Sequence, residues 1–291
     1  MANTFNAGVY TEAYEIKLQE RLNKPTTWKD VCDVIYSDVK IFNMPYMSTE
    51  FSLQSGTRGT AYSHSDFALT NDTIDIATHE IVSILQDRAD FAQCQYVTQM
   101  EIAERAGQLC AAKIETVFLA DHGEWTNAGD SAGVVTSGVS TTFTVQATNI
   151  DDIVRDARSI IIAADGKEIM DRDGLAFVWR AADYKLLEQY AQNNGFQLAD
   201  YALKNGIPNA YFFLGAYHYV SNSHAANHVF FGVRKVVKIG LLRSTWGKLF
   251  FNPNAVNADG PVSAVSWEQR VDWDVMTPNG LATLVYDFNV V

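Results

Sequence analysis

Several features that identify common classes of protein are scarce or missing in this chain. Its 291 residues include only three cysteines, Cys32, Cys94 and Cys110, which are too few and too scattered for a disulfide framework and suit a reducing cytoplasm. No apolar run approaches the roughly 18 residues that a membrane span needs, so we expect no membrane contact. The first residues also lack the basic start and apolar stretch of a secretory signal peptide.

Positive charge is scarce too, which argues against tight binding of nucleic acid. The chain carries 22 Lys and Arg against 34 Asp and Glu, for a net charge of −12, whereas proteins that bind DNA or RNA freely present a cationic surface. The alternation within VFFGVRKVVKIGLL favours the solvated face of a strand over a phosphate-binding track. This segment holds most of the densest basic stretch, which consists of Arg234, Lys235, Lys238 and Arg243.

Motifs for catalysis and cofactor binding are missing from the sequence. It has no Gly-rich phosphate loop, no nucleophile elbow and no CxxC pair. No pair of carboxylates stands out for general acid–base chemistry. Glu101, Glu104 and Glu115 lie on one helical segment and are interpreted as solvated side chains or weak ion pairs. We therefore expect no catalytic residues, no cofactor and no enzymatic activity.

Two short segments resemble metal sites only weakly. His224 and His228 have the i, i+4 spacing of helical zinc ligands, but HAANH lacks the Glu of a zinc protease motif and lies in a loop that enters a strand. Asp171, Asp173 and Gly174 begin like a calcium loop, but the later ligands and the closing Glu are missing, so a turn is predicted. We expect no metal site.

A long amphipathic helix is the strongest feature that the sequence does contain. Residues 87–121 lack Pro, and small or apolar residues recur along them in steps of 3 and 4. About 30 residues at 1.5 Å each give a rod of roughly 45 Å. We expect the stripe to pack on a sheet, with Gly107 as a point of close approach. Its members are Tyr96, Met100, Ala103, Gly107, Cys110, Ile114 and Val117.

The segments before this helix contain few apolar residues. Residues 1–45 read as a polar arm. Residues 46–72 alternate as two strands around the flexible turn SGTRGT and predict a long hairpin. An isolated hairpin is at best marginally stable in water, so we expect it to lie on another surface. Residues 73–86 predict a strand with Ile74 and Ile76 on one face.

The rest of the chain alternates helices and strands before strands take over. This alternation predicts a small mixed α/β domain, followed by strands, of which the last turns at TPNG and returns to the first body. The predicted β-rich segments are 134–146, 174–180, 210–220, 227–243 and 263–288, and the predicted helices are 150–166 and 183–193.

The order of these parts resembles the major capsid proteins of tailed bacteriophages, which share the Hong Kong 97-type fold. The resemblance covers nearly the whole chain: an arm, a hairpin with the tip SGTRGT, a strand leading into one long helix, an α/β domain and a last β-hairpin. It implies an α+β fold. In the terms of that family, the N-arm would be 1–45, the E-loop 46–72, the P-domain 73–147 and 248–291 with its spine helix at about 88–120, and the A-domain 148–247.

The resemblance implies a structural function. The chain would self-assemble through hexamers and pentamers into an icosahedral head that encloses double-stranded DNA, in the cytoplasm of a bacterial host, and would remain in the virion. The implied partners are other copies of the chain, a portal and separate scaffolding or decoration proteins, with weak non-specific contact to the packaged DNA. Contacts between subunits are expected at the hairpin tip, at Gly56, Arg58, Gly59 and Tyr62.

Two departures from the family and two alternatives qualify this expectation. Some members join subunits covalently through a Lys of the E-loop, but no Lys lies between Lys40 and Lys113. The arm also leaves no room for the scaffolding segment that precedes it in many members, so a separate scaffolding protein, or none, is expected. One alternative is an encapsulin-type nanocompartment shell. The other is a cytosolic enzyme whose site is assembled from distant residues.

Overall fold

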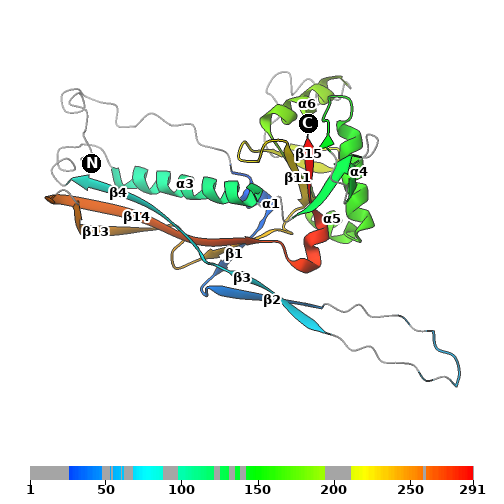
Figure 1. Cartoon of the computed structure of the whole chain (residues 1–291), viewed down its shortest axis with the longest axis horizontal. Coiled ribbons are helices and arrows are strands. Elements are labelled where there is room, and N and C mark those ends of the chain that lie inside the picture. Colours follow the sequence, from blue (N-terminus) through cyan, green and yellow to red (C-terminus); the bar gives the residue numbers. More distant parts are fainter. Residues whose placement is uncertain are drawn as a thin grey trace.

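The chain forms two sheet-based bodies, with a hairpin that projects away from both (Figure 1). The computed structural model describes residues 26–47, 53, 55–59, 61, 68–87, 98–120, 125–130, 135–137, 142–193, 211–257 and 260–290. Helices and strands both contribute substantially, which confirms the expected α+β class. Residues 1–25, most of the expected arm, lie outside the described residues.

The first body is a five-stranded sheet built around the long strand β14 (Gly260–Met276). The strand β4 (Thr78–Asp87) pairs antiparallel with one edge of β14, and β13 (Lys248–Asn257) pairs antiparallel with the other. Beyond β13, the end of β14 pairs with β12 (Lys238–Leu242), which is parallel to β1 (Asp33–Ser37). Every other strand of this sheet therefore depends on β14, directly or through β12.

The helix α3 (Thr98–Ala120) lies along this sheet and packs on β14 and β4, as the sequence predicts (Figure 1). Its buried residues include Cys110, Ile114 and Phe118, which share one face of the helix. Ile114 and Phe118 are both fully buried, and each contributes about 2 kcal/mol to stability relative to an exposed position. Residues 88–97, the expected start of the helix, lie outside the described residues.

The second body is an eight-stranded mixed sheet with β8 (Leu175–Trp179) near its centre. All five residues of β8 are buried, because β8 lies between β10 (Ala216–Val220), which is parallel to it, and β11 (His228–Val233), which is antiparallel. The strand order is β6-β5-β15-β11-β8-β10-β9, with β7 beside β15. The other strands are β5 (Thr126–Asp130), β6 (Val135–Ser137), β7 (Thr142–Phe143), β9 (Tyr211–Phe213) and β15 (Val285–Val290).

Helices α4 (Ile150–Ala163), α5 (Lys167–Asp173) and α6 (Ala181–Asn193) belong to the second body. The sequence predicts α4 and α6, and their apolar faces are buried as expected. It misses α5, because the DRDG segment that we interpreted as a turn contains the last residues of this helix. Gly174 then ends α5 with a φ of 85°, a left-handed value that glycine adopts at little cost.

The projecting hairpin has a stem of two strands, β2 (Ile41–Met47) and β3 (Leu69–Asp75), paired antiparallel over their full lengths. The stem thus begins before the expected 46–72 segment. The expected strand at 73–86 is in fact two strands, because β3 ends at Asp75 and β4, in a different sheet, begins at Thr78. Ile74 and Ile76 are both buried, as the sequence predicts.

Two β-rich segments near the C-terminus cross from one sheet to the other. In 227–243, β11 lies in the second body, the chain turns at Lys235 with a φ of 64°, and β12 joins the first. In 263–288, β14 lies in the first body, and the 3-10 helix η3 (Asn279–Leu284) leads to β15, which pairs with β11 in the second. The expected return to the first body is therefore wrong. The alternation of apolar and polar side chains predicts where strands lie. Because this alternation is the same in both sheets, it cannot show to which sheet a strand belongs.

Candidate functional site

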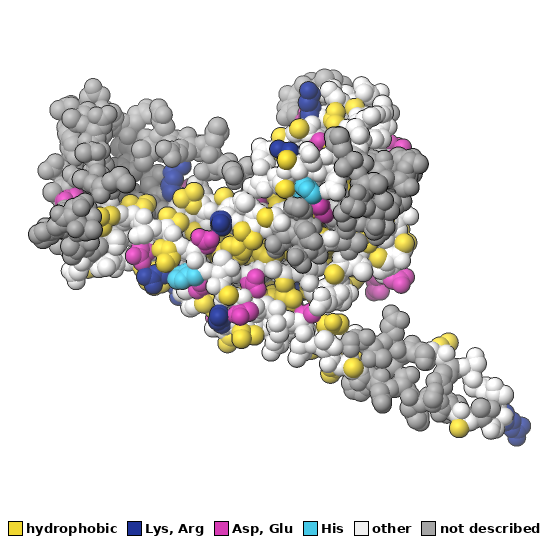
Figure 2. Space-filling view, in the orientation of Figure 1, with side chains coloured by type: hydrophobic (Ala, Val, Ile, Leu, Met, Phe, Trp, Pro, Cys, Tyr) yellow, Lys and Arg dark blue, Asp and Glu magenta, His cyan; other side chains and the backbone are white. Residues whose placement is uncertain are grey.

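The tip of the hairpin contains three of the four residues at which we expected subunit contacts. Gly56, Arg58 and Gly59 are described, and Tyr62 lies outside the described residues. A Cβ atom added at Gly56 or Gly59 would meet no atom within 4 Å, and Gly59 has a left-handed φ of 88°. Arg58 is exposed, and Figure 2 shows a basic side chain at the far end of the hairpin. The tip is thus an open turn that presents a cation.

One face of the hairpin stem is exposed and carries several apolar side chains, most of them at its outer end. Strand alternation places Ile41, Pro45 and Met47 on the same face of β2, and Leu69 stands opposite Met47 on β3. The exposed fraction is 55% for Ile41, 50% for Met47 and 65% for Leu69. The same face also carries Asn43 on β2 and Asn71, Thr73 and Asp75 on β3, so Ile41 is separated from the apolar side chains of Pro45, Met47 and Leu69. Exposed apolar side chains gathered at the outer end of a projecting stem are a candidate interaction surface.

The root of the stem is attached firmly to the first body. The carboxylate of Asp72 is 6% exposed and accepts hydrogen bonds from the backbone N–H of Asn279, at 2.9 Å, and from its Nδ2, at 3.2 Å. Ile74 is fully buried, and a Cβ atom added at Gly240 would lie only 2.8 Å from its Cγ2. The stem is therefore held in one direction at its root while its apolar face remains uncovered.

A buried carboxylate lies where the arm meets the long helix. Glu115 of α3 is 0% exposed. Its Oε2 accepts the backbone N–H groups of Thr27 and Trp28, each at 2.9 Å, and its Oε1 accepts the Thr27 hydroxyl at 2.7 Å. These N–H groups begin α1 (Trp28–Val31), a single turn whose first donors have no partner within the helix. The interpretation of Glu115 as a solvated side chain is wrong.

The indole of Trp28 makes a second attachment to α3. Trp28 is fully buried, and its Nε1 donates to the carbonyl oxygen of Ala111 at 3.1 Å. Cys32 is buried directly after α1, and burial raises the pKa of its thiol, with smaller effects from the carboxylates of Glu115 and Asp33. The thiol of Cys32 is therefore held in its protonated form. Cys110 on α3 is buried as well, and burial likewise raises the pKa of its thiol, so both cysteines serve as small buried side chains.

The linker 234–237, which joins β11 to β12, is bound to both bodies. The backbone N–H of Arg234 donates to the carbonyl of Gly174 at 2.9 Å, and its Nε donates to the carbonyl of Asp30 at 3.0 Å. Its guanidinium also lies over the ring of Tyr217, 4.5 Å from the centroid. Arg234 therefore connects the second body to the segment that follows the arm.

The same linker follows residues 31–33 along their length. The backbone N–H of Lys235 donates to the carbonyl of Val31 at 2.7 Å, and the N–H of Asp33 donates to the carbonyl of Val237 at 2.8 Å. The carboxylate of Asp33 pairs with Nζ of Lys238 at 3.0 Å. Residues 27–33 thus lie between α3 on one side and the linker on the other.

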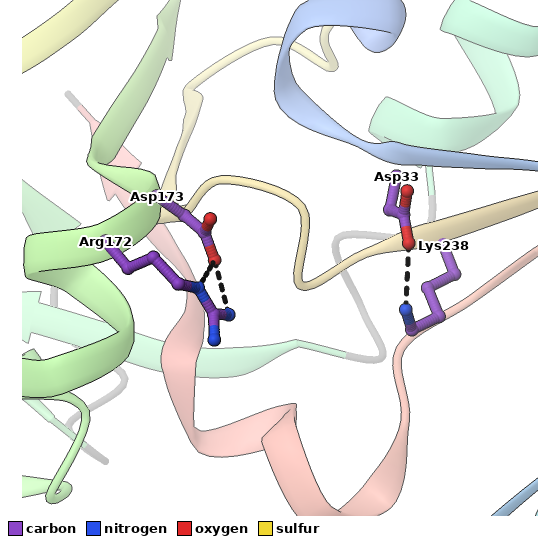
Figure 3. Close-up of polar contacts among 4 residues, drawn as sticks. All are labelled: Asp33, Arg172, Asp173 and Lys238. Atoms are coloured by element: carbon purple, nitrogen blue, oxygen red, sulfur yellow. Dashed lines mark hydrogen bonds and ion pairs between the residues drawn. The ribbon is translucent and has the colours of Figure 1, made fainter.

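Figure 3 shows two ion pairs at this junction, one at the end of α5 and one between β1 and β12. In the first, Nε and Nη2 of Arg172 donate to Oδ2 of Asp173 at 3.1 and 2.7 Å, and this hydrogen bonding lowers the pKa of Asp173. In the second, Lys238 pairs with Asp33. The basic stretch spans a junction between two strands and not one strand face: Lys238 is partly buried and paired with Asp33, whereas Lys235 and Arg243 are exposed to solvent as expected.

Two histidines that we considered as metal ligands do lie together. The rings of His224 and His228 are parallel with centroids 6.3 Å apart, and Nδ1 of His228 is 2.7 Å from Oδ2 of Asp287. Burial lowers the pKa of His228. Among the described residues, no group of three or more His, Cys, Asp or Glu is arranged to hold a metal ion. Nor does any helix in that part of the chain have the length and hydropathy of a membrane span.

His218 is a core residue in the second body. It is fully buried, its Nδ1 accepts the indole N–H of Trp179 at 3.0 Å, and its Nε2 lies 3.1 Å from the carbonyl oxygen of Phe213. These partners fit a neutral ring protonated at Nε2. Burial lowers the pKa of His218 to about 4, so the ring is neutral at pH 7 and serves packing.

Comparison with known proteins gives matches at the level of fold. No family model matches the sequence, and no curated protein matches it. A solved structure from Mycobacterium phage Che8 matches with a TM-score of 0.66 and 14% identity, over 99% of this chain and 98% of that chain. The capsid of an empty gene transfer agent particle matches with a TM-score of 0.69 and 14% identity, over 98% and 96%. The capsid of Cyanophage P-SCSP1u matches with a TM-score of 0.59 and 12% identity, over 100% and 97%.

These matches establish the architecture of the chain. They span nearly the full length of both partners in each comparison, so both bodies, the long helix and the hairpin are shared together. The chain has the Hong Kong 97-type fold that the sequence predicted. At identities of 12–14%, what these matches show is the fold alone.

Proposed function

We propose that this chain is a major capsid protein, a structural subunit that assembles with copies of itself into an icosahedral shell. The observation that carries the proposal is the projecting hairpin, with its exposed apolar face and fixed root. Solved neighbours of the same architecture include proteins described as capsids. A subunit whose apolar hairpin face is uncovered by its own body is suited to bury that face on another subunit.

Another copy of the chain is the simplest occupant for this face. Asp72 and Ile74 fix the direction of the stem, so the hairpin cannot fold back over its own sheets without breaking these contacts. In a shell, each copy offers one hairpin and one receiving surface. Such head-to-tail contacts form a closed ring when the rotation from one copy to the next adds up to a full turn. Full burial of Ile41, Met47 and Leu69 would add about 3 kcal/mol per hairpin, at about 1 kcal/mol for each half-exposed side chain.

The charge distribution suits a wall around packaged DNA better than a DNA-binding surface. The net charge is −12, Lys238 and Arg243 pair with the carboxylates of Asp33 and Asp38, and Nε of Arg234 donates to the backbone carbonyl of Asp30. Contact with packaged double-stranded DNA would therefore be weak and non-specific. The proposal includes residence in the virion, with a portal and separate scaffolding or decoration proteins as further partners.

Particle size after expression tests the proposal directly. We expect the purified chain, under conditions where shells survive, to sediment as large closed particles that electron microscopy shows to be round shells. A monomer or small oligomer would overturn the proposal and favour a cytosolic enzyme. Shells that carry an enzyme and no DNA when isolated from the natural host would favour an encapsulin.

A substitution on the stem tests the role of the hairpin. Leu69→Asp places a charge on the exposed apolar face, so we expect folded subunits that no longer form shells. Ile162→Asp is the control, because Ile162 is also exposed, at 43%, but lies on α4 in the second body. Normal shells from Leu69→Asp would show that the hairpin face is not an assembly surface.

A further inference from the structure

Residues 27–33 contact both bodies, although they form only one helical turn and one strand start. The bodies also meet directly, where the ring of Phe118 on α3 packs on Phe230 of β11 with centroids 5.4 Å apart. On one side, Thr27 and Trp28 are bound by Glu115 of α3. On the other, the carbonyls of Asp30 and Val31 accept hydrogen bonds from the linker 234–237. This linker is the point at which the chain passes from the second sheet to the first.

Glu115 is suited to fix this segment because a buried charge tolerates little movement. Its carboxylate is 0% exposed, and no salt bridge joins it to a cation within the described residues. A buried charge without a counter-ion is costly unless hydrogen bonds satisfy it. Here three donors from Thr27 and Trp28 do so, and hydrogen bonds to a charged group are stronger than neutral ones. Displacement of residues 27–28 would leave the carboxylate buried and unsatisfied.

We propose that Glu115 is a positioning residue that fixes the angle between the two bodies through residues 27–33. Its hydrogen bonds hold the start of α1 against α3, and the end of α1 then holds the linker through the carbonyl groups of Asp30 and Val31. The same contact fixes the backbone at Thr27, which lies within the expected arm of 1–45. The consequence for shells rests on the proposed function, since the angle between the bodies would set the curvature of each tile.

Amide hydrogen exchange on the full-length subunit tests the coupling. The variants are Glu115→Ala and the milder Glu115→Gln, which keeps the shape of the side chain if the alanine variant does not fold. The control is Glu104→Ala, because Glu104 is exposed on the same helix and bonds only to Gln108. We expect exchange at Thr27 and Trp28 to rise about tenfold or more in Glu115→Ala, and by less in Glu115→Gln.

The decisive measurement lies on the far side of the segment. If residues 27–33 couple the bodies, the amide of Lys235, which donates to Val31, should also exchange about tenfold faster in the Glu115 variants. The amide of Phe177, in the centre of β8, should not change in any variant. Faster exchange at Thr27 and Trp28 with unchanged exchange at Lys235 would overturn the coupling. Unchanged exchange at Thr27, Trp28 and Lys235 would overturn the role of Glu115 itself.

Shell size separates this inference from the proposed function. We expect the parent and Glu104→Ala to form shells of one diameter, and Glu115→Gln to form shells of several diameters or open sheets. Uniform shells from Glu115→Gln would overturn the link to curvature and leave the capsid function intact. Absence of shells from the parent would overturn the capsid function, while the exchange data would still decide the role of Glu115.

Discussion

Replacement of Gly107 with alanine should stabilise the folded subunit. Gly107 lies in the interior of α3, where glycine is less favourable than alanine by about 1 kcal/mol because it gains more freedom in the unfolded chain. An added Cβ atom would meet only the side chain of Gln269, at 3.9 Å from Nε2 and 4.0 Å from Oε1, which is ordinary van der Waals contact. The interpretation of Gly107 as a point of close approach is therefore wrong, and no clash opposes the gain. We expect the free energy of unfolding to rise by about 0.5–1 kcal/mol.

Thermal unfolding of the unassembled subunit measures this effect. For a chain of this size, about 1 kcal/mol shifts the Tm by roughly 2–4 °C, so we expect a rise of about 1–4 °C. Gly247→Ala is a matched control, since an added Cβ atom there would meet no atom within 4 Å and so no clash, but Gly247 has a left-handed φ of 68°. Alanine at Gly247 should cost about 1 kcal/mol and lower the Tm.

The opposite result at Gly107 would refute the reasoning. A lower Tm for Gly107→Ala, with Gly247→Ala behaving as expected, would mean that α3 and β14 approach more closely in solution than the distance to Gln269 indicates. If both variants lowered the Tm equally, the difference in backbone conformation between Gly107 and Gly247 would not determine how alanine affects stability at these sites.

Three further outcomes follow from the described contacts. Gly240→Ala should destabilise the subunit by about 1–3 kcal/mol in urea unfolding, because the new Cβ would lie 2.8 Å from Cγ2 of Ile74; no loss would mean that the hairpin root can shift. The pKa of His218 is about 4 when folded and about 6.5 when unfolded, so the unfolded state binds the extra proton and stability falls as pH drops through this window, by about 3 kcal/mol in total. This part of the pH dependence should disappear in His218→Gln, and its persistence would assign it to other groups. Arg58→Ala should leave subunit stability within about 0.5 kcal/mol of the parent but make shells dissociate at lower denaturant concentration, whereas equally resistant shells would exclude Arg58 from the contact.

The sequence predicted elements whose pattern is local and missed those that depend on distant partners. The face of α3 that carries Cys110 and Ile114 was visible because burial on one side of a helix repeats every three to four residues. Glu115 was missed because its partners lie 87 and 88 residues away in the chain. A signal did exist: Ala111 and Leu119, four residues to either side on the same face, are apolar, so a charge between them was placed towards the core.

Sheet membership was the second limit of sequence reasoning. Strands β11 and β12 are separated by only four residues but lie in different sheets. Strands β14 and β15, joined by a short segment that contains η3, also lie in different sheets. The side-chain alternation of a strand reports which faces are buried, not which neighbour supplies the hydrogen bonds. Positive φ at Lys235 marks the first crossing, and a non-glycine residue in that conformation cannot be read from sequence.

Under the proposed function, the hairpin shows why an assembly surface is only half visible in one chain. Its tip was predicted from SGTRGT, because a Gly-rich turn between polar strands has nothing of its own to pack against, and the structure does leave Gly56 and Gly59 in open space. The receiving surface has no such signal, since it is made of residues that are distant in sequence and are already part of a stable sheet or helix. A hairpin with a rigid root and an uncovered face transmits its direction to whatever it binds. Under the proposed function, the contacts of Asp72 and Ile74 at that root therefore set the direction in which the hairpin reaches a neighbouring subunit.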